Sequence, residues 1–169
     1  GQGYTISNMS DAGYVASKSG IYENSTEQNV YGYAYGLFGV VNAENVVIKN
    51  VKLANVQING VSIVDGDAYR ADSVAGVVGY SGDGSISISN CEVSGSIKGY
   101  DAVGGIAGRL YHGDFVVKNC INRADLVATR DGGAKSAGIL AYVSYDTENT
   151  VSLTFSNCEN YGNVTADPL

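Results

Sequence analysis

Aspartates beside glycine are the first residues in this sequence whose types could support chemistry. Asp65 and Asp67 stand in Val-Asp-Gly-Asp, and the other candidates are Asp83, Asp101, Asp114 and Asp131. Polysaccharide hydrolases and lyases need two or three carboxylates that converge on a groove, often with calcium. An aspartate next to glycine more often caps a turn through its own side chain. We therefore favour turns, and keep Asp65 with Asp67 as a two-carboxylate candidate for calcium; no cofactor is expected.

The number and spacing of the histidine and cysteine residues do not match known catalytic or metal-binding motifs. His112 is the only histidine, whereas a zinc-protease motif needs two on one helix, and no nucleophile elbow accompanies it for a Ser-His-Asp triad. We expect His112 in an exposed loop. The three cysteines, Cys91, Cys120 and Cys158, form no C-x-x-C pair. This spacing favours core packing over a thiolate metal site.

Each cysteine belongs to a repeated pattern: an apolar residue, Ser or Lys, Asn, then Met, Val or Cys. It occurs at 6–9, 48–51, 88–91, 117–120 and 155–158. A second marker, a tetrapeptide that begins with Gly, lies at 36–39, 76–79, 105–108 and 138–141. From its first residue to the next Asn the distance is 14 residues in three copies (36 to 50, 76 to 90, 105 to 119) and 19 in the fourth (138 to 157). Equal spacing between two markers indicates a repeat array.

Short strands fill each repeat, and we expect three: the Gly-bounded tetrapeptide, an alternating run such as Ile86 and Ile88, and a run after the Asn. Strands this short bury their apolar faces only if every repeat forms one turn of a coil, with parallel pairing between turns. The sequence therefore predicts an all-β parallel β-helix of four to five coils as one domain over 1–169. The repeats are expected near 34–73, 74–102, 103–135 and 136–166, with 10–33 as a loop or insertion.

The Asn of the repeat is expected at a sharp corner, because Asn tolerates left-handed backbone angles better than other non-glycine residues. Stacked coils then place the corner amides above one another as a hydrogen-bonded ladder. Its members are Asn50, Asn90, Asn119 and Asn157. The next residue points inward, so Cys91, Cys120 and Cys158 are expected in an interior column with Val51, which Met9 begins.

Charge and hydropathy exclude two classes of partner. The net charge is −7 with ten scattered Lys and Arg, whereas nucleic-acid binding needs clustered positive charge. No apolar run approaches the length of a membrane span. The chain opens on a strand-like segment without a signal peptide, which indicates a fragment of a longer protein.

Tyrosines are the residues that could bind a partner: there are 13 and no Trp. Tyr80, Arg109 and Tyr142 directly follow the Gly-bounded tetrapeptide in successive repeats, so we expect them to stack as an outward row. Tyr rings can stack on sugars or anchor a protein. Two interpretations remain open, a binding row and aromatic packing that shields the sheet. Tyr22, Tyr31, Tyr33 and Tyr35 form a second cluster that could cap the first coil.

At its Gly-bounded tetrapeptides, above all Gly36-Leu37-Phe38-Gly39, the chain resembles the GLUG-repeat family of bacterial surface proteins. The segments 3–9 and 157–165 are similar to the stretches before and after such a motif. The resemblance implies a right-handed β-helix, an extracellular or cell-surface location and no catalytic residues.

The function expected is a non-catalytic segment with an adhesion or spacer role, its partner a host glycan or host protein. Two alternatives are a carbohydrate-active β-helix enzyme and a substrate-presenting accessory region of a secreted protease of the type that cleaves immunoglobulin A.

Overall fold

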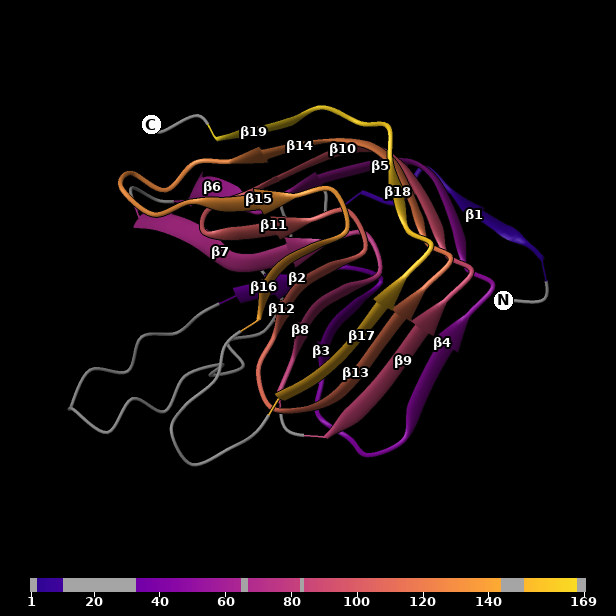
Figure 1. Cartoon of the computed structure of the whole chain (residues 1–169). Coiled ribbons are helices and arrows are strands. Elements are labelled where there is room, and N and C mark those ends of the chain that lie inside the picture. Colours follow the sequence, from indigo (N-terminus) through magenta and orange to yellow (C-terminus); the bar gives the residue numbers. More distant parts are fainter. Residues whose placement is uncertain (1–2, 11–32, 65–66, 83, 144–150, 167–169) are drawn as a thin grey trace.

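The computed structural model describes residues 3–10, 33–64, 67–82, 84–143 and 151–166. Within these ranges the chain is built from strands that stack in four sheets, and every pairing between coils is parallel (Figure 1). Apart from the first strand and one antiparallel hairpin strand, each strand pairs with its equivalent in the next coil, as the repeat predicts. The fold is therefore a parallel β-helix.

Strands are assigned to sheets A to D. Sheet A contains β1 (Thr5–Ser7), β5 (Lys52–Asn59), β10 (Glu92–Gly99), β14 (Ile121–Ala128), β18 (Glu159–Asn160) and β19 (Val164–Ala166). Sheet B contains β2 (Tyr33–Tyr35), β7 (Asp67–Ala75), β11 (Ala102–Gly104) and β15 (Lys135–Ala137), with β6 (Val61–Val64) antiparallel to β7. Sheet C contains β3 (Phe38–Val41), β8 (Val78–Ser81), β12 (Ala107–Leu110) and β16 (Leu140–Val143). Sheet D contains β4 (Val46–Lys49), β9 (Ser85–Ser89), β13 (Gly113–Lys118) and β17 (Val151–Ser156).

Each coil passes through sheets B, C, D and A in that order, so it has four strands rather than the three expected. The additional strand is the one in sheet B, which in β11 and β15 is three residues long and too short to show period-two alternation. In Figure 1 the chain circulates counterclockwise while later coils lie nearer the viewer, so the helix is right-handed.

The Gly-bounded tetrapeptide forms a corner instead of the extended run that we expected. Its first two residues make a bend between sheets B and C, and its last two begin the strand of sheet C. The reason for glycine is close approach between coils. A Cβ atom on Gly105 would clash with the carbonyl oxygen of Gly138 and the side chain of Asn122. One on Gly138 would clash with the side chain of Asn160, which belongs to the same coil.

The interior is filled by columns of side chains that follow the register of the sheets. In sheet D, Ile86 pairs with Phe115 and Ile88 with Val117, and all four are buried. In sheet A, Ile97 lies between Ile58 and Leu126. The interior residues of the second and third coils are covered by a coil on each side and form one continuous hydrophobic core.

The first Asn marker, Asn8, does not lie where the sequence pattern predicts. β1 pairs with β5 and not with β4: Ser7 aligns with Ala54, and the amide of Asn8 donates to the Ala54 carbonyl oxygen at 2.9 Å. Asn8 therefore stacks at the positive-φ position of Asn55 (φ 59° and 56°). The prediction that Met9 begins the cysteine column is wrong for the same reason, because the Met9 carbonyl accepts from the amide of Gln57.

Candidate functional site

The predicted row of Tyr80, Arg109 and Tyr142 exists as a stack but is not an open surface. Backbone pairing aligns Tyr80 with Arg109, and Arg109 with Tyr142, on neighbouring strands of sheet C. Tyr80 is only 5% exposed, Arg109 is 6% exposed and Tyr142 is half-buried. The expectation of an outward row is therefore wrong for the first two residues. Their side chains have become part of the packing.

Asp101 explains why a guanidinium can be buried at this position. It lies in the bend before β11, is 4% exposed, and accepts charged hydrogen bonds from three cations. Arg109 donates through Nη2 at 2.9 Å, Arg130 through Nη1 at 3.0 Å and Lys135 through Nζ at 3.0 Å. A buried charge is tolerated only when it is paired and hydrogen-bonded, and both carboxylate oxygens meet that condition here.

Tyr142 completes this charged cluster. Its ring centroid lies 5.0 Å from Cζ of Arg109 and 4.8 Å from Nζ of Lys135, which are cation–π distances. Burial lowers the pKa of Arg109, the negative charge of ionised Tyr142 would raise it, and Arg130 lowers it further. One carboxylate against three cations leaves these four charged residues with a net charge of +2 on a chain of net charge −7.

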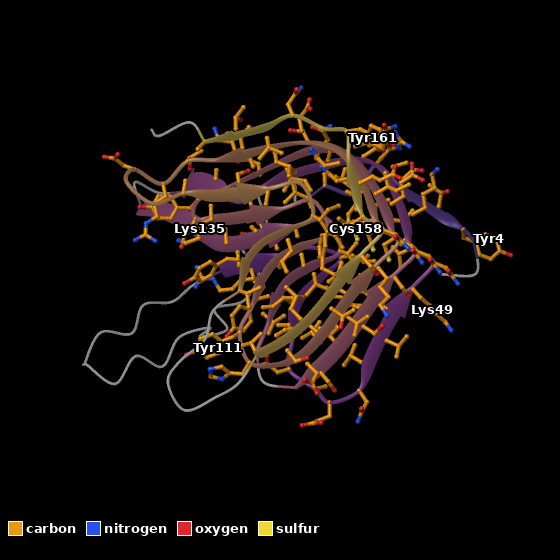
Figure 2. The ribbon with its side chains drawn as sticks, in the orientation of Figure 1. Tyr4, Lys49, Tyr111, Lys135, Cys158 and Tyr161 are labelled. Carbon is orange, nitrogen blue, oxygen red and sulfur yellow. The ribbon has the colours of Figure 1, made fainter. Side chains whose placement is uncertain are left out.

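The charged cluster joins two coils. Asp101 and Arg109 belong to the third coil, Lys135 and Tyr142 to the fourth, and Arg130 lies in the connection between them. Figure 2 shows Lys135 at the left of the view, where β15 begins. The amide of Lys135 also donates to the Asp101 carbonyl oxygen at 2.8 Å. We call Asp101, Arg109, Arg130, Lys135 and Tyr142 the Asp101 cluster.

Sequence reasoning singled out three members of the Asp101 cluster, Asp101, Arg109 and Tyr142, but gave Asp101 a different role and missed Arg130 and Lys135. Asp101 was expected to cap a turn, and it does stand in a bend, but its carboxylate points to cations that follow it by 8, 29 and 34 residues. One signal was available: Asp101 lies two residues after Gly99, and Gly99 is paired to Ala128 just before Arg130. The proximity of Asp101 and Arg130 can be inferred from it only when the register between the two coils is known.

The four corner asparagines form the ladder expected from the repeat. Asn50, Asn90, Asn119 and Asn157 all have φ between 52° and 56°. Each side-chain amide donates to the preceding Oδ1: Asn90 to Asn50 at 3.2 Å, Asn119 to Asn90 at 3.1 Å and Asn157 to Asn119 at 3.3 Å. The ladder is exposed, and it connects all four coils along one edge.

Next to the ladder, Cys91 and Cys120 are buried and Cys158 is partly buried, all with free thiols. Each Sγ donates to the carbonyl oxygen two residues earlier at 3.3 Å. Hydrogen bonding with Cys91 and burial raise the pKa of the Cys120 thiol. Figure 2 labels Cys158 at the turn between β17 and β18. Within the described ranges no three His, Cys, Asp or Glu side chains gather as a metal site.

A second pair of amides, absent from the sequence-based expectations, lies inside sheet A. Asn122 is fully buried, and its Nδ2 donates to the Ala124 carbonyl at 2.9 Å and to Asn160 Oδ1 at 2.7 Å. Its Oδ1 accepts from the Ala124 amide at 3.0 Å. In the next coil, Nδ2 of Asn160 makes the equivalent hydrogen bond, to the carbonyl oxygen of Gly162. These side chains satisfy backbone groups where sheet A bends, at the level where Gly105 and Gly138 approach them.

The remaining candidates do not converge with these residues. Asp65 and Asp83, as well as the side chain of Asp67, lie outside the described residues, as do Tyr22, Tyr31 and most of 10–33. Asp114 and Asp131 are exposed and far apart in the coil, on β13 and on the turn before β15. His112 lies in the predicted loop, half-buried instead of exposed, with its ring 3.8 Å from that of Tyr111.

The described residues therefore form a buried cluster of paired charges and polar contacts that connect successive coils. They contain no helix of the length and apolarity that crossing a membrane requires. No protein-family model, curated protein or solved structure matches the chain.

Proposed function

We propose that this chain is a non-catalytic, β-helical spacer segment of a secreted or cell-surface bacterial protein. The proposal rests on one observation: polar contacts link the third and fourth coils at two separate edges. The exposed asparagine ladder runs along one edge. The Asp101 cluster joins the same coils elsewhere on the stack. Contacts of this kind resist bending and shear between coils, which is what a spacer needs.

The resemblance to the GLUG-repeat family supports the same proposal from the sequence, through Gly36-Leu37-Phe38-Gly39 and its three looser copies. The structure gives two of those glycines a role in coil stacking, since a side chain at Gly76 or Gly105 would clash with a carbonyl oxygen of the next coil. The residues that carry the resemblance are therefore explained by packing, as expected for a segment whose task is mechanical.

Adhesion is the second candidate function, and one observation favours it. Arg130 and Lys135 keep 43% and 32% of their side chains exposed while they hold Asp101, so the cluster presents positive charge at its rim. Carboxylated or sulfated glycans of a host surface would suit such a rim. Tyr80 and Arg109 are too deeply buried to contribute by direct contact.

The spacer role is tested by pulling the chain from its two ends in a single-molecule force experiment. We expect cooperative unfolding of the whole coil stack. Asn119→Ala should lower the unfolding force, whereas Lys118→Ala, one residue before it on sheet D and outside the ladder, should leave the force unchanged. Unzipping of single coils at low force, with no effect of Asn119→Ala, would contradict a spacer that resists mechanical force.

Adhesion is tested separately with an array of neutral, carboxylated and sulfated glycans and with host matrix proteins. Replacement of Arg130 and Lys135 by alanine should abolish any binding to acidic glycans. The charge-matched control is the double variant Lys49→Ala with Lys118→Ala, which also removes two positive charges but lies on sheet D. Binding that survives the double replacement would exclude the Asp101 cluster. Release of reducing ends from a polysaccharide would contradict the non-catalytic assignment and favour the enzyme alternative.

A further inference from the structure

The last coil exposes side chains whose column neighbours in the second and third coils are buried. Leu153 continues the column of Phe115 and is 43% exposed, and Phe155 continues the column of Val117 and is 47% exposed. Val164 ends the column of Leu126 in the same way. All three belong to inward columns, so their exposure arises because nothing in the described structure lies beyond them. They form an apolar surface at the end of the stack, which we call the end face.

The two ends of the stack differ along one column of sheet D and one of sheet A, whereas in sheet C the first coil is itself open, with Phe38 43% exposed next to buried Val78. At the first coil, Ile48 starts the column that Phe155 ends, and Ile58 starts the column that Val164 ends. Ile48 is nevertheless only 6% exposed and Ile58 4% exposed. The first coil therefore has its inward side chains covered along these two columns. The fourth coil does not, although its sequence pattern is the same.

On the side of the end face, backbone and side-chain amide groups of the fourth coil have no hydrogen-bond partner among the described residues. β15, β16, β17 and β18 are each the last strand of their sheet, so one edge of every strand has no ladder partner among the described residues. Asn157 donates to Asn119, but its Oδ1 accepts no hydrogen bond within the described part of the chain. In the ladder below it, that acceptor position is filled by the amide of the next coil.

We infer that the end face binds one further parallel β-helical coil of the same repeat pattern. The argument is continuity with the three coil-to-coil interfaces already formed. The partner would place two alternating apolar residues over Leu153 and Phe155, a corner Asn whose amide donates to Asn157, and a glycine over Gly138. Exposed strand edges recruit strands by main-chain hydrogen bonds, and the apolar columns fix the register.

A second copy of this chain fits the end face less well. Its first coil already has Ile48 and Ile58 covered, so it cannot offer open columns to Phe155 and Val164. Two end faces that meet about a two-fold axis would pair their strands antiparallel and continue none of the columns. The inference is independent of the spacer proposal, because it requires only the packing of the fourth coil.

The test adds a coil in register. Residues 100–128 form a connection and one complete coil, all of it described, and Ala166 pairs with Ala128, which in turn pairs with Gly99. A copy of 100–128 placed directly after Ala166 therefore supplies β-strands in the correct order. We expect a higher midpoint of unfolding in urea, one cooperative transition, and slowed hydrogen exchange at the amides of β17.

The matched control carries Asp in place of the added copies of Phe115 and Val117, which removes the apolar contact with Leu153 and Phe155. It should return the midpoint and the β17 exchange rates to those of the unmodified chain. Phe155→Asp gives a second check: it should change the midpoint of the unmodified chain little and remove the gain from the added coil. In analytical ultracentrifugation the unmodified chain should sediment as a monomer.

Three results would overturn the inference. The first is an unchanged midpoint with proteolysis of the added coil. The second is a gain that persists in the Asp control, because the end face would not then be the docking surface. The third is concentration-dependent association of the unmodified chain that Phe155→Asp abolishes, because a second copy would then be the occupant.

Discussion

Asp101→Asn is the substitution that should destabilise the protein most among single charge changes. The carboxylate is buried and receives Arg109, Arg130 and Lys135, and of these only Arg109 is equally buried, with 8% of its side chain exposed. Removal of one member of a buried ion pair typically costs about 3–5 kcal/mol, because the other charge stays in a desolvated site. Exposed ion pairs contribute only about 0–1 kcal/mol each.

The size of the effect follows from these two classes of contact. Asn keeps a side-chain oxygen that can still accept one hydrogen bond, so we expect about 3 kcal/mol, the lower end of the buried-pair range. Arg130→Met and Lys135→Met should each cost about 1 kcal/mol or less, since both cations are partly exposed. Arg109→Met combined with Asp101→Asn should cost less than the two single changes added together.

Urea unfolding followed by circular dichroism measures these free energies, with Asp131→Asn as the control because Asp131 is an exposed aspartate of the neighbouring turn. High salt should reduce the contributions of Arg130 and Lys135 but leave that of Arg109 nearly unchanged. An Asp101→Asn variant as stable as Asp131→Asn would refute the reasoning, as would strict additivity with Arg109→Met.

Three further predictions concern the coil stack. A thiol reagent should label Cys120 in denaturant but scarcely in the native protein, and Cys120→Ser should cost about 1–3 kcal/mol; rapid native labelling would contradict its burial. Asn119→Ala should lower the melting temperature more than Asn8→Ala, because Asn119, unlike Asn8, has two ladder partners; equal shifts would show that the ladder adds nothing. The hydrogen bond from Lys52 lowers the pKa of Glu92. Glu92→Gln should therefore lower the free energy of unfolding at pH above about 4.3, and this loss should shrink as the pH falls further. A difference in free energy between the two proteins that stays constant from pH 7 to 3 would contradict this.

The sequence by itself determined the repeat and the architecture that follows from it. Asn90 and Asn119 at equal distance from a Gly-bounded marker indicate stacked coils, and alternation in Ile86-Ser87-Ile88 gives a half-buried strand. These features are local: a positive-φ corner and a period of two depend on a few consecutive residues. Parallel stacking then follows because no helix is available to cover the strands. The asparagine ladder could be derived for the same reason.

Tertiary structure decided which coil each local pattern joins and which side chains become buried. Ile6-Ser7-Asn8 has the same letters as Ile88-Ser89-Asn90 of sheet D, yet it pairs with β5 in sheet A, since register depends on the neighbouring strand and not on the motif. From the local sequence, Arg109 was expected to be a surface cation. The cluster that buries it includes Arg130 and Lys135, which are distant from Arg109 in the sequence. Burial of that guanidinium depends on charges 29 and 34 residues away from Asp101, brought close only by stacking of the coils.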